Sequence, residues 1–407
     1  MNLHLLYIDP GTGSALFSIL IGAAATIYFL GRALIIKLKV FFSGGKTVNA
    51  ASSEHPFVIY NEGKQYWNVF KPVLDEFESQ KTALLYLTSA QDDPVFDTSW
   101  NFIKAEFIGE GNRAFARLNM LRAGICLMTT PGLDVYQLKR SKMVKHYSHL
   151  LHAPVDATLY RLFSFDYFDS VLLTGDYQAE DIKALERQRN IQEKKLITVG
   201  CSYLDVYAEK IKNLPKEENH PFTVLVSPSW GPSALLSHYG EKLLDPLAAS
   251  LWRIIIRPHP QSKKAEAAML ERLQTRYKDS SNVEWDFERE NIYSLNKADI
   301  MISDFSGIIF DYMFLFDKPV LYVSQNFDLR IYDADDLEHE MWLSKTLKEA
   351  GIELSEDYFS RITEVIKDAG DSEILKTARK KARETAWRFP GEAGKRIFNF
   401  MKEIVNG

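Results

Sequence analysis

Short, continuously apolar segments alternate with amphipathic segments along most of this 407-residue chain, in two successive series. A strand in which nearly every residue is apolar is buried on both faces, which is typical of a parallel sheet covered by helices. The amphipathic segments between the strands supply those covering helices. The pattern therefore predicts an α/β protein of two Rossmann-like, doubly wound domains with a deep cleft between them.

The two series are separated by a charged, proline-containing stretch at Asn213–Pro221. We therefore expect one domain over 55–212, a second over 221–385, and a helix over 386–407 that packs back onto them. The strands expected in the first domain are Phe57–Tyr60, Ala83–Thr88, Phe102–Ile108, Ile125–Thr130, His146–Leu151, Val171–Thr174 and Leu196–Val199. Those expected in the second are Phe222–Val226, Trp252–Ile256, Asn282–Trp285, Ile300–Ser303 and Val320–Val323.

The N-terminal segment has a different character, because residues 11–31 contain no charged side chain. As a helix, this run would span about 30 Å, the thickness of one bilayer core. Arginine and lysine follow the run and do not precede it. We therefore expect 1–46 to be a single-pass membrane anchor with its N-terminus outside and the rest of the chain on the cytoplasmic side.

Composition excludes several other classes of protein. A formal net charge of −5 gives no basic field for nucleic acid. The only cysteines, Cys126 and Cys201, cannot form a disulfide framework or a four-thiolate metal site. We expect no metal and no cofactor.

Two segments of the second series carry polar residues where a predicted strand ends. The first is Arg257-Pro258-His259-Pro260, in which the prolines hold the loop extended. Arginine is a permanently charged, forked donor, and histidine beside it can donate to a phosphate. Pairing of Arg257 with a surface carboxylate is the structural alternative.

The second segment is Ser303-Asp304-Phe305-Ser306-Gly307, which lies between a predicted strand and a predicted helix. Hydroxyl groups and the free amides of a first helical turn form an anion site. Asp304 would repel a phosphate, so we expect it to cap the helix or orient a neighbour. An ordinary helix cap without a ligand is the alternative interpretation.

In the first series, His152 follows the apolar pair Leu150-Leu151 at a predicted strand end. A general base and a buried core histidine are equally compatible with this position.

These motifs resemble the CDP-glycerol glycerophosphotransferase family, the teichoic-acid primases and polymerases of the bacterial cell envelope. The resemblance covers roughly residues 140–400. Besides the two polar segments, it rests on Ile309-Phe310-Asp311-Tyr312 and Asp317-Lys318-Pro319-Val320. It departs from the family at Ala153, where glycine is usual, and at Gly307, where a second serine is common.

The resemblance implies a GT-B fold and a transferase that moves a polyol phosphate, most readily glycerol phosphate, from a CDP-linked donor to a lipid-linked or glycan acceptor at the bacterial cytoplasmic membrane. It implies that His152 is the base and that His259 acts at the donor diphosphate. It further implies that this diphosphate is bound by Arg257, Ser303, Ser306 and Gly307, with Asp304 in an orienting role. Two alternatives stay open: a GT-B enzyme that uses a UDP-sugar, such as a glycosyltransferase or an enzyme like UDP-N-acetylglucosamine 2-epimerase, and a membrane-anchored binding protein without catalysis. The oligomeric state cannot be inferred.

Overall fold

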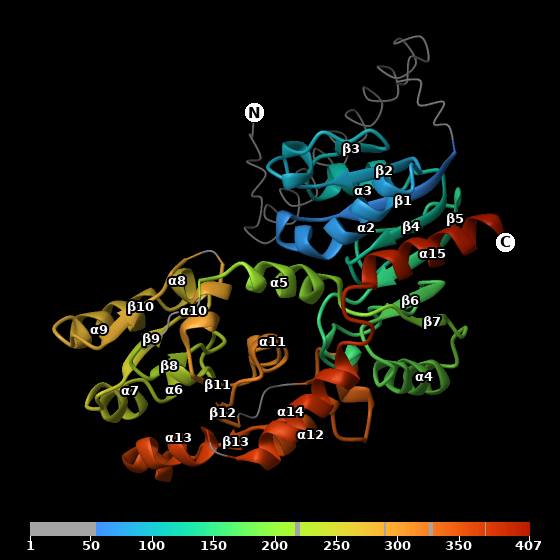
Figure 1. The fold of residues 1–407 in the computed structure, drawn as a ribbon. Helices are drawn as coiled ribbons and strands as arrows, with labels where there is room; N and C mark the ends of the chain where they lie inside the picture. The colour runs from blue at the N-terminus through green and yellow to red at the C-terminus, as the bar shows by residue number, and fades with distance from the viewer. Residues whose placement is uncertain (1–53, 216–219, 289, 325–328, 371) are drawn as a thin grey trace, which may run out of the picture. The chain divides into compact units, whose positions relative to one another are not determined.

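All of the predicted strands form, and they build two separate parallel sheets (Figure 1). The computed structural model describes residues 54–215, 220–288, 290–324, 329–370 and 372–407, so the expected anchor at 11–31 lies outside it. None of the helices in those described ranges has both the length and the apolar character that crossing a bilayer requires. The predicted domain boundaries remain predictions.

The first sheet has seven strands in the order β3-β2-β1-β4-β5-β6-β7, and each neighbouring pair is parallel. The order reverses between β1 and β4, which is where doubly wound sheets open a crevice for a ligand. Its strands are β1 (His55–Asn61), β2 (Leu84–Thr88), β3 (Ile103–Phe107), β4 (Ala123–Met128), β5 (Val144–Leu150), β6 (Ser170–Leu173) and β7 (Lys195–Thr198).

The second sheet has six parallel strands in the order β10-β9-β8-β11-β12-β13, and its switch point lies between β8 and β11. The sequence did not predict β13, because a strand of two residues leaves no apolar run to recognise. Its strands are β8 (Thr223–Val226), β9 (Arg253–Ile256), β10 (Val283–Trp285), β11 (Ile300–Ser303), β12 (Val320–Tyr322) and β13 (Ile352–Glu353).

Helices cover both sheets and join them. In chain order they are α2 (Trp67–Ser79), α3 (Asn112–Leu118), α4 (Gln178–Arg189), α5 (Ser202–Lys212), α6 (Leu235–His238), α7 (Glu241–Ala248), α8 (Ser262–Ala265), α9 (Ala267–Tyr277), α10 (Ile292–Lys297), α11 (Ile308–Phe316), α12 (Trp342–Ala350), α13 (Ile362–Gly370), α14 (Glu373–Ala386) and α15 (Ala393–Asn406). Two short 3-10 helices, η1 (Lys64–Tyr66) and η4 (Asp333–Asp336), lie in loops of the two halves.

The last helix, α15, belongs to the core of the first sheet although it ends the chain (Figure 1). Ile397 and Met401 are fully buried there, and the Phe398 ring packs edge-on against Phe77 of α2 at 4.8 Å. The chain thus returns to its first half after completing the second. The return is held by Asp205 of α5, whose carboxylate accepts hydrogen bonds from the Trp387 indole and from the backbone amides of Gly391 and Ala393.

Buried charges join the two halves on the side of α4. The Arg189 guanidinium donates to Asp166 at 2.8 Å and to Asp333 and Asp336 at 2.6 Å each. Asp333 is fully buried, so its charge depends on this pairing. Nearby, the carboxylate of Asp156 accepts from the first two amides of α12, at 2.6 and 2.8 Å.

Candidate functional site

The predicted donor site lies at the switch point of the second sheet, where β8 and β11 run side by side. Asp304 follows β11 directly and is buried, with 1% of its surface exposed. Its two carboxylate oxygens accept hydrogen bonds from the amides of Ser229 and Leu235, each at 2.9 Å. Asp304 therefore holds the loop that connects β8 to α6 near both of its ends.

Burial raises the pKa of Asp304, and the amides of Leu235 and Ser229 oppose that shift. The carboxylate faces backbone donors, so its charge stabilises the loop conformation through hydrogen bonds to two amides. The amide dipoles that point at the carboxylate offset part of the repulsion that it would exert on a phosphate nearby.

Ser306 and Gly307 lie where the anion site was predicted, immediately before α11. Ser306 is half-buried and Gly307 is exposed. A side chain added at Gly307 would meet no atom within 4 Å, so the space in front of this peptide is open. The amides of Ile309 and Phe310 already donate to the carbonyls of Ser306 and Gly307, at 3.2 and 3.1 Å. Because the space at Gly307 is open, a ligand phosphate can approach the peptides that begin this turn closely.

Two predicted contact residues are placed differently. Ser303 is fully buried, and its hydroxyl donates to the Ser227 carbonyl at 2.6 Å. Arg257 is 8% exposed, pairs with Asp286 at 2.5 Å and donates to the Glu288 carbonyl at 2.7 Å. Both side chains therefore brace the loops around the site, and the expectation that they also bind the diphosphate stays a prediction.

His259 is half-exposed, and its ring stacks against Trp230 with ring centroids 6.3 Å apart. Burial lowers its pKa, partly offset by the charges of Asp304 and Glu266. Its Nδ1 accepts from the Gln261 amide at 3.2 Å. In the neutral ring the proton then resides on Nε2, which makes that nitrogen a hydrogen-bond donor.

His152 lies on the first sheet, in the loop after β5. Its ring is held edge-on by Tyr66 and Tyr160, with centroids at 4.9 and 5.9 Å. Nδ1 lies 3.0 Å from the Tyr160 hydroxyl. Burial lowers the pKa of His152 to about 4, so the imidazole is neutral at physiological pH. A neutral ring with one nitrogen held by a neighbour has the form that a general base requires.

Sequence reasoning missed the partners of these histidines. Tyr66 and Tyr160 have no motif that marks them, and they reach His152 only through the fold of η1 and of the loop after β5. Trp230, in the loop after β8, stacks on His259 and is 48% exposed, which favours a role in lining the site.

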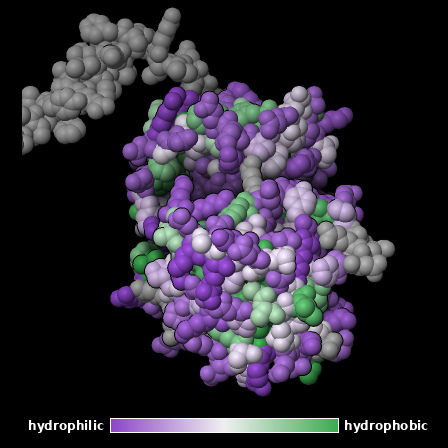
Figure 2. Space-filling view, turned by 90° about the vertical axis from the view of Figure 1, so that its left-hand side faces the viewer, coloured by the Kyte–Doolittle hydropathy of each residue, from purple (hydrophilic) through white to green (hydrophobic). Residues whose placement is uncertain are grey.

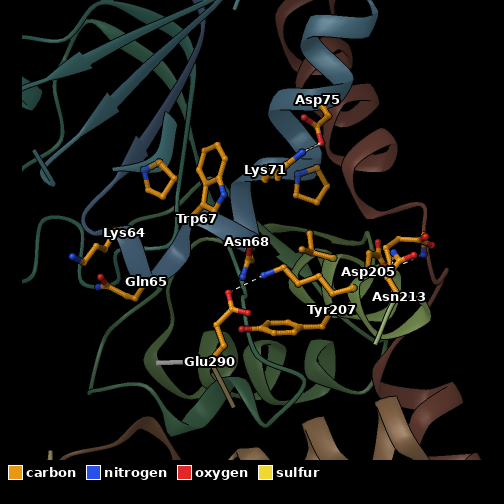
Figure 3. Close-up of a pocket in the computed structure, with 16 residues that line it drawn as sticks. Lys64, Gln65, Trp67, Asn68, Lys71, Asp75, Asp205, Tyr207, Asn213 and Glu290 are labelled. Carbon is orange, nitrogen blue, oxygen red and sulfur yellow. Dashed lines mark hydrogen bonds and ion pairs between the residues drawn. The ribbon is translucent and has the colours of Figure 1, made fainter. Parts of the chain in front are cut away.

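A pocket of about 1030 Å³ opens between α2, α5 and the loop after β10 (Figure 3). Lys210 of α5 reaches across to Glu290 at 3.1 Å, and the Tyr207 ring lies beside this pair. None of the predicted site residues lines this pocket. Gln65 does, and the adjacent Tyr66 contacts His152, so the pocket approaches the predicted base from the side of the first sheet.

Comparison with known protein families supports the predicted resemblance. The sequence model of the family described as CDP-Glycerol:Poly(glycerophosphate) glycerophosphotransferase matches residues 174–341. The matched region includes the Arg257-to-His259 and Ser303-to-Gly307 segments, whereas His152 lies outside it. The match confirms the resemblance and the expectation of an enzyme of the transferase class. No curated protein sequence matches the chain.

Solved structures show the fold. A putative UDP-N-acetylglucosamine 2-epimerase from Listeria monocytogenes superposes with a TM-score of 0.58 at 11% identity, over 86% of this chain and 96% of that one. The UDP-GlcNAc 2-epimerase of Neisseria meningitidis, bound to UDP-GlcNAc, gives 0.56 at 13% identity, over 86% and 100%. A glycosyltransferase from Rickettsia africae gives 0.51 at 10%, over 86% and 99%. The described chain therefore has the two-sheet, GT-B-like α/β architecture that was predicted.

Proposed function

We propose that this protein transfers glycerol phosphate from CDP-glycerol to an acceptor hydroxyl during synthesis of a bacterial cell-envelope polymer, with release of CMP. The observation that carries the proposal is the match of the glycerophosphotransferase family over 174–341, which includes the open turn at Ser306 and Gly307. We further propose that residues 11–31 anchor the protein with its sheets on the cytoplasmic side, where nucleotide-linked donors are made.

In this reaction the acceptor oxygen attacks the phosphorus that carries glycerol, and the bond from that phosphorus to the oxygen of CMP breaks. The Tyr160 hydroxyl lies 3.0 Å from Nδ1 of His152. In the tautomer whose Nδ1 proton is donated to that hydroxyl, Nε2 is unprotonated and takes the acceptor proton. At the other end, the Nε2 proton of His259 and the amides at the start of α11 stabilise the charge that develops on the leaving CMP.

Donor binding tests the proposal without knowledge of the acceptor. The full-length protein in detergent is titrated calorimetrically with CDP, CDP-glycerol, CDP-ribitol, UDP and UDP-N-acetylglucosamine. We expect selective binding of CDP-glycerol, weakened at least tenfold by His259→Ala and by Ser306→Ala. Ser281→Ala, an exposed serine just before the amino end of β10, is the matched control and leaves affinity unchanged. Preference for UDP compounds, or no binding at millimolar nucleotide, would contradict the proposal.

A further inference from the structure

A buried glutamine that the proposed mechanism does not use, Gln178 of α4, lies beside the loop that carries His152. The surface seen in Figure 2 is largely hydrophilic, whereas the Gln178 side chain has no exposed surface. Its carboxamide oxygen accepts hydrogen bonds from the amide and the hydroxyl of Thr174, at 2.9 and 3.2 Å. Its carboxamide nitrogen donates to the carbonyls of Ala153 and Val155, at 3.3 and 2.7 Å. A carboxamide has two donor and two acceptor positions, so all four are used.

The loop held by Gln178 is the segment that places the proposed base. Strand β5 ends two residues before His152, and the backbone from His152 to Asp156 belongs to no helix or strand. Such a segment has no ladder of backbone hydrogen bonds, so other groups have to satisfy and fix its carbonyls. Because Ala153 and Val155 are the first and third residues after His152, the bonds from Gln178 fix the backbone that carries the imidazole.

The far end of the same loop is tied to the second half of the chain. The buried carboxylate of Asp156 accepts from the amides of Trp342 and Leu343, the first two residues of α12, at 2.6 and 2.8 Å. The Trp342 ring packs against Tyr177, which precedes Gln178, and against Phe310 of α11, with ring centroids 4.3 and 5.4 Å apart. Helix α11 begins at the turn where the donor phosphate is proposed to bind. The loop of the base is therefore fixed to α4 and, through α12, to the helix of the donor turn.

We infer that Gln178 and Asp156 are positioning residues of the transfer reaction, which hold the His152 loop to the two halves of the chain and so set the place of the base relative to the donor turn. The inference rests on the proposed function for the identity of the reaction. Both residues act through the backbone of the loop. A base has to lie within hydrogen-bond reach of the proton that it takes, and a misplacement of about 1 Å can lower a rate about a hundredfold. Loss of either contact should therefore slow the transfer step and leave donor binding, on the second sheet, unchanged.

Two variants test this role. Gln178→Met keeps the length of the side chain and removes its hydrogen bonds, and Asp156→Asn leaves one acceptor oxygen for the two amides of α12. Gln188→Met, at an exposed position of the same helix α4, is the matched control. CMP release from CDP-glycerol is followed with the full-length protein in detergent and with molar glycerol as the acceptor. We expect kcat to fall at least tenfold in Gln178→Met and at least threefold in Asp156→Asn, with KM for CDP-glycerol within about twofold of wild type. The control should change neither constant.

Hydrogen–deuterium exchange at C2 of each imidazole, read by mass spectrometry at pH 7.5, tests the placement of His152 without any substrate. Exchange at His152 should become at least fivefold faster in both test variants, whereas exchange at the fully buried His149 and at His259 should not change. Equal acceleration at His149 and His152 would indicate general loosening of the first sheet and would overturn the positioning role.

Two results from the kinetics would also overturn the inference. One is a loss of kcat/KM that a rise in KM explains, and the other is wild-type kcat together with wild-type exchange at His152 in both variants. Absence of CMP release by the wild-type protein would instead contradict the proposed function. The two failures are distinguishable because the exchange rates are read without turnover.

Discussion

Replacement of His149 by leucine should make the protein less sensitive to acid. His149 is fully buried at the end of β5, among the rings of Tyr160, Phe165 and Phe168 at 5.6, 4.8 and 5.1 Å. Among the described residues, neither of its ring nitrogens makes a well-formed hydrogen bond, and only the Thr130 backbone favours the charged ring. Burial consequently lowers its pKa to about 3. The folded protein holds this ring neutral, whereas the unfolded chain protonates it near pH 6.5.

The sign and size of the effect follow from proton linkage. Between pH 6.5 and pH 3 the unfolded state binds one more proton at this site, so stability falls as the pH falls, by about 1.4 kcal/mol per pH unit. At pH 5 the wild-type protein has therefore lost about 2 kcal/mol through His149 alone. Leucine has a similar volume and no proton to bind. At pH 7 the variant should lie within about 1 kcal/mol of wild type, because removal of two buried, poorly hydrogen-bonded nitrogens offsets imperfect packing.

Urea unfolding followed by circular dichroism at pH 7.5, 6.0 and 5.0 measures the difference between variant and wild type. That difference should shift in favour of the variant by about 2 kcal/mol between pH 7.5 and pH 5. Other histidines titrate alike in both proteins and cancel. His238→Leu, an exposed position on α6, should show no such shift. A difference that stays constant with pH would refute the reasoning.

Three further predictions concern buried groups. Asp304→Asn weakens the hydrogen bonds that the carboxylate accepts from two amides. It should lower the free energy of unfolding in urea by about 3 kcal/mol and weaken CDP-glycerol binding at least tenfold. Unchanged affinity would show that Asp304 does not orient the donor site. Arg189→Met leaves the buried Asp333 charge without its partner and should lower the free energy of unfolding by about 3 to 5 kcal/mol. Adding Asp333→Asn to this variant should recover most of that stability. Strictly additive losses in the double variant would refute the coupling. Because the pKa of His152 is about 4, the base stays unprotonated and initial rates should not fall between pH 7.5 and pH 5.5. Tyr160→Phe should lower kcat about tenfold with KM unchanged, because the ring loses its hydrogen-bond partner. A loss of rate with an apparent pKa near 6.5 would contradict the assignment of His152 as the base.

The fold could be predicted closely from the sequence because each strand is marked by its own short stretch of residues. Each buried parallel strand is an apolar run with its own ends, so the strands from β1 to β12 could be placed from the residues alone. Only β13 escaped, since Ile352 and Glu353 form no run. The chain's own pattern also predicted the turn at Ser306 and Gly307, because a strand, a small polar turn and a helix follow one another directly.

The roles of individual side chains were harder to predict, because a residue type does not show which way it points. Ser303 and Arg257 carry groups suited to a phosphate, but the fold turns them toward Ser227 and Asp286. Both partners lie on neighbouring strands or loops far away in sequence. His152 shows the converse, because burial and Tyr160 gave it the properties of a base that no local pattern contains.

The position of α15 has a consequence for the order in which the chain can fold during synthesis. The first sheet begins at β1, but Ile397, Phe398 and Met401 complete its core. During synthesis, all strands of the second sheet therefore leave the ribosome before the α15 side chains that complete the core of the first sheet. Until then the face of α2 that receives Phe398 is uncovered, and chains truncated before Ala393 should be trapped in that state. The fourteen residues of α15 complete a core whose first strand, β1, was made more than three hundred residues earlier.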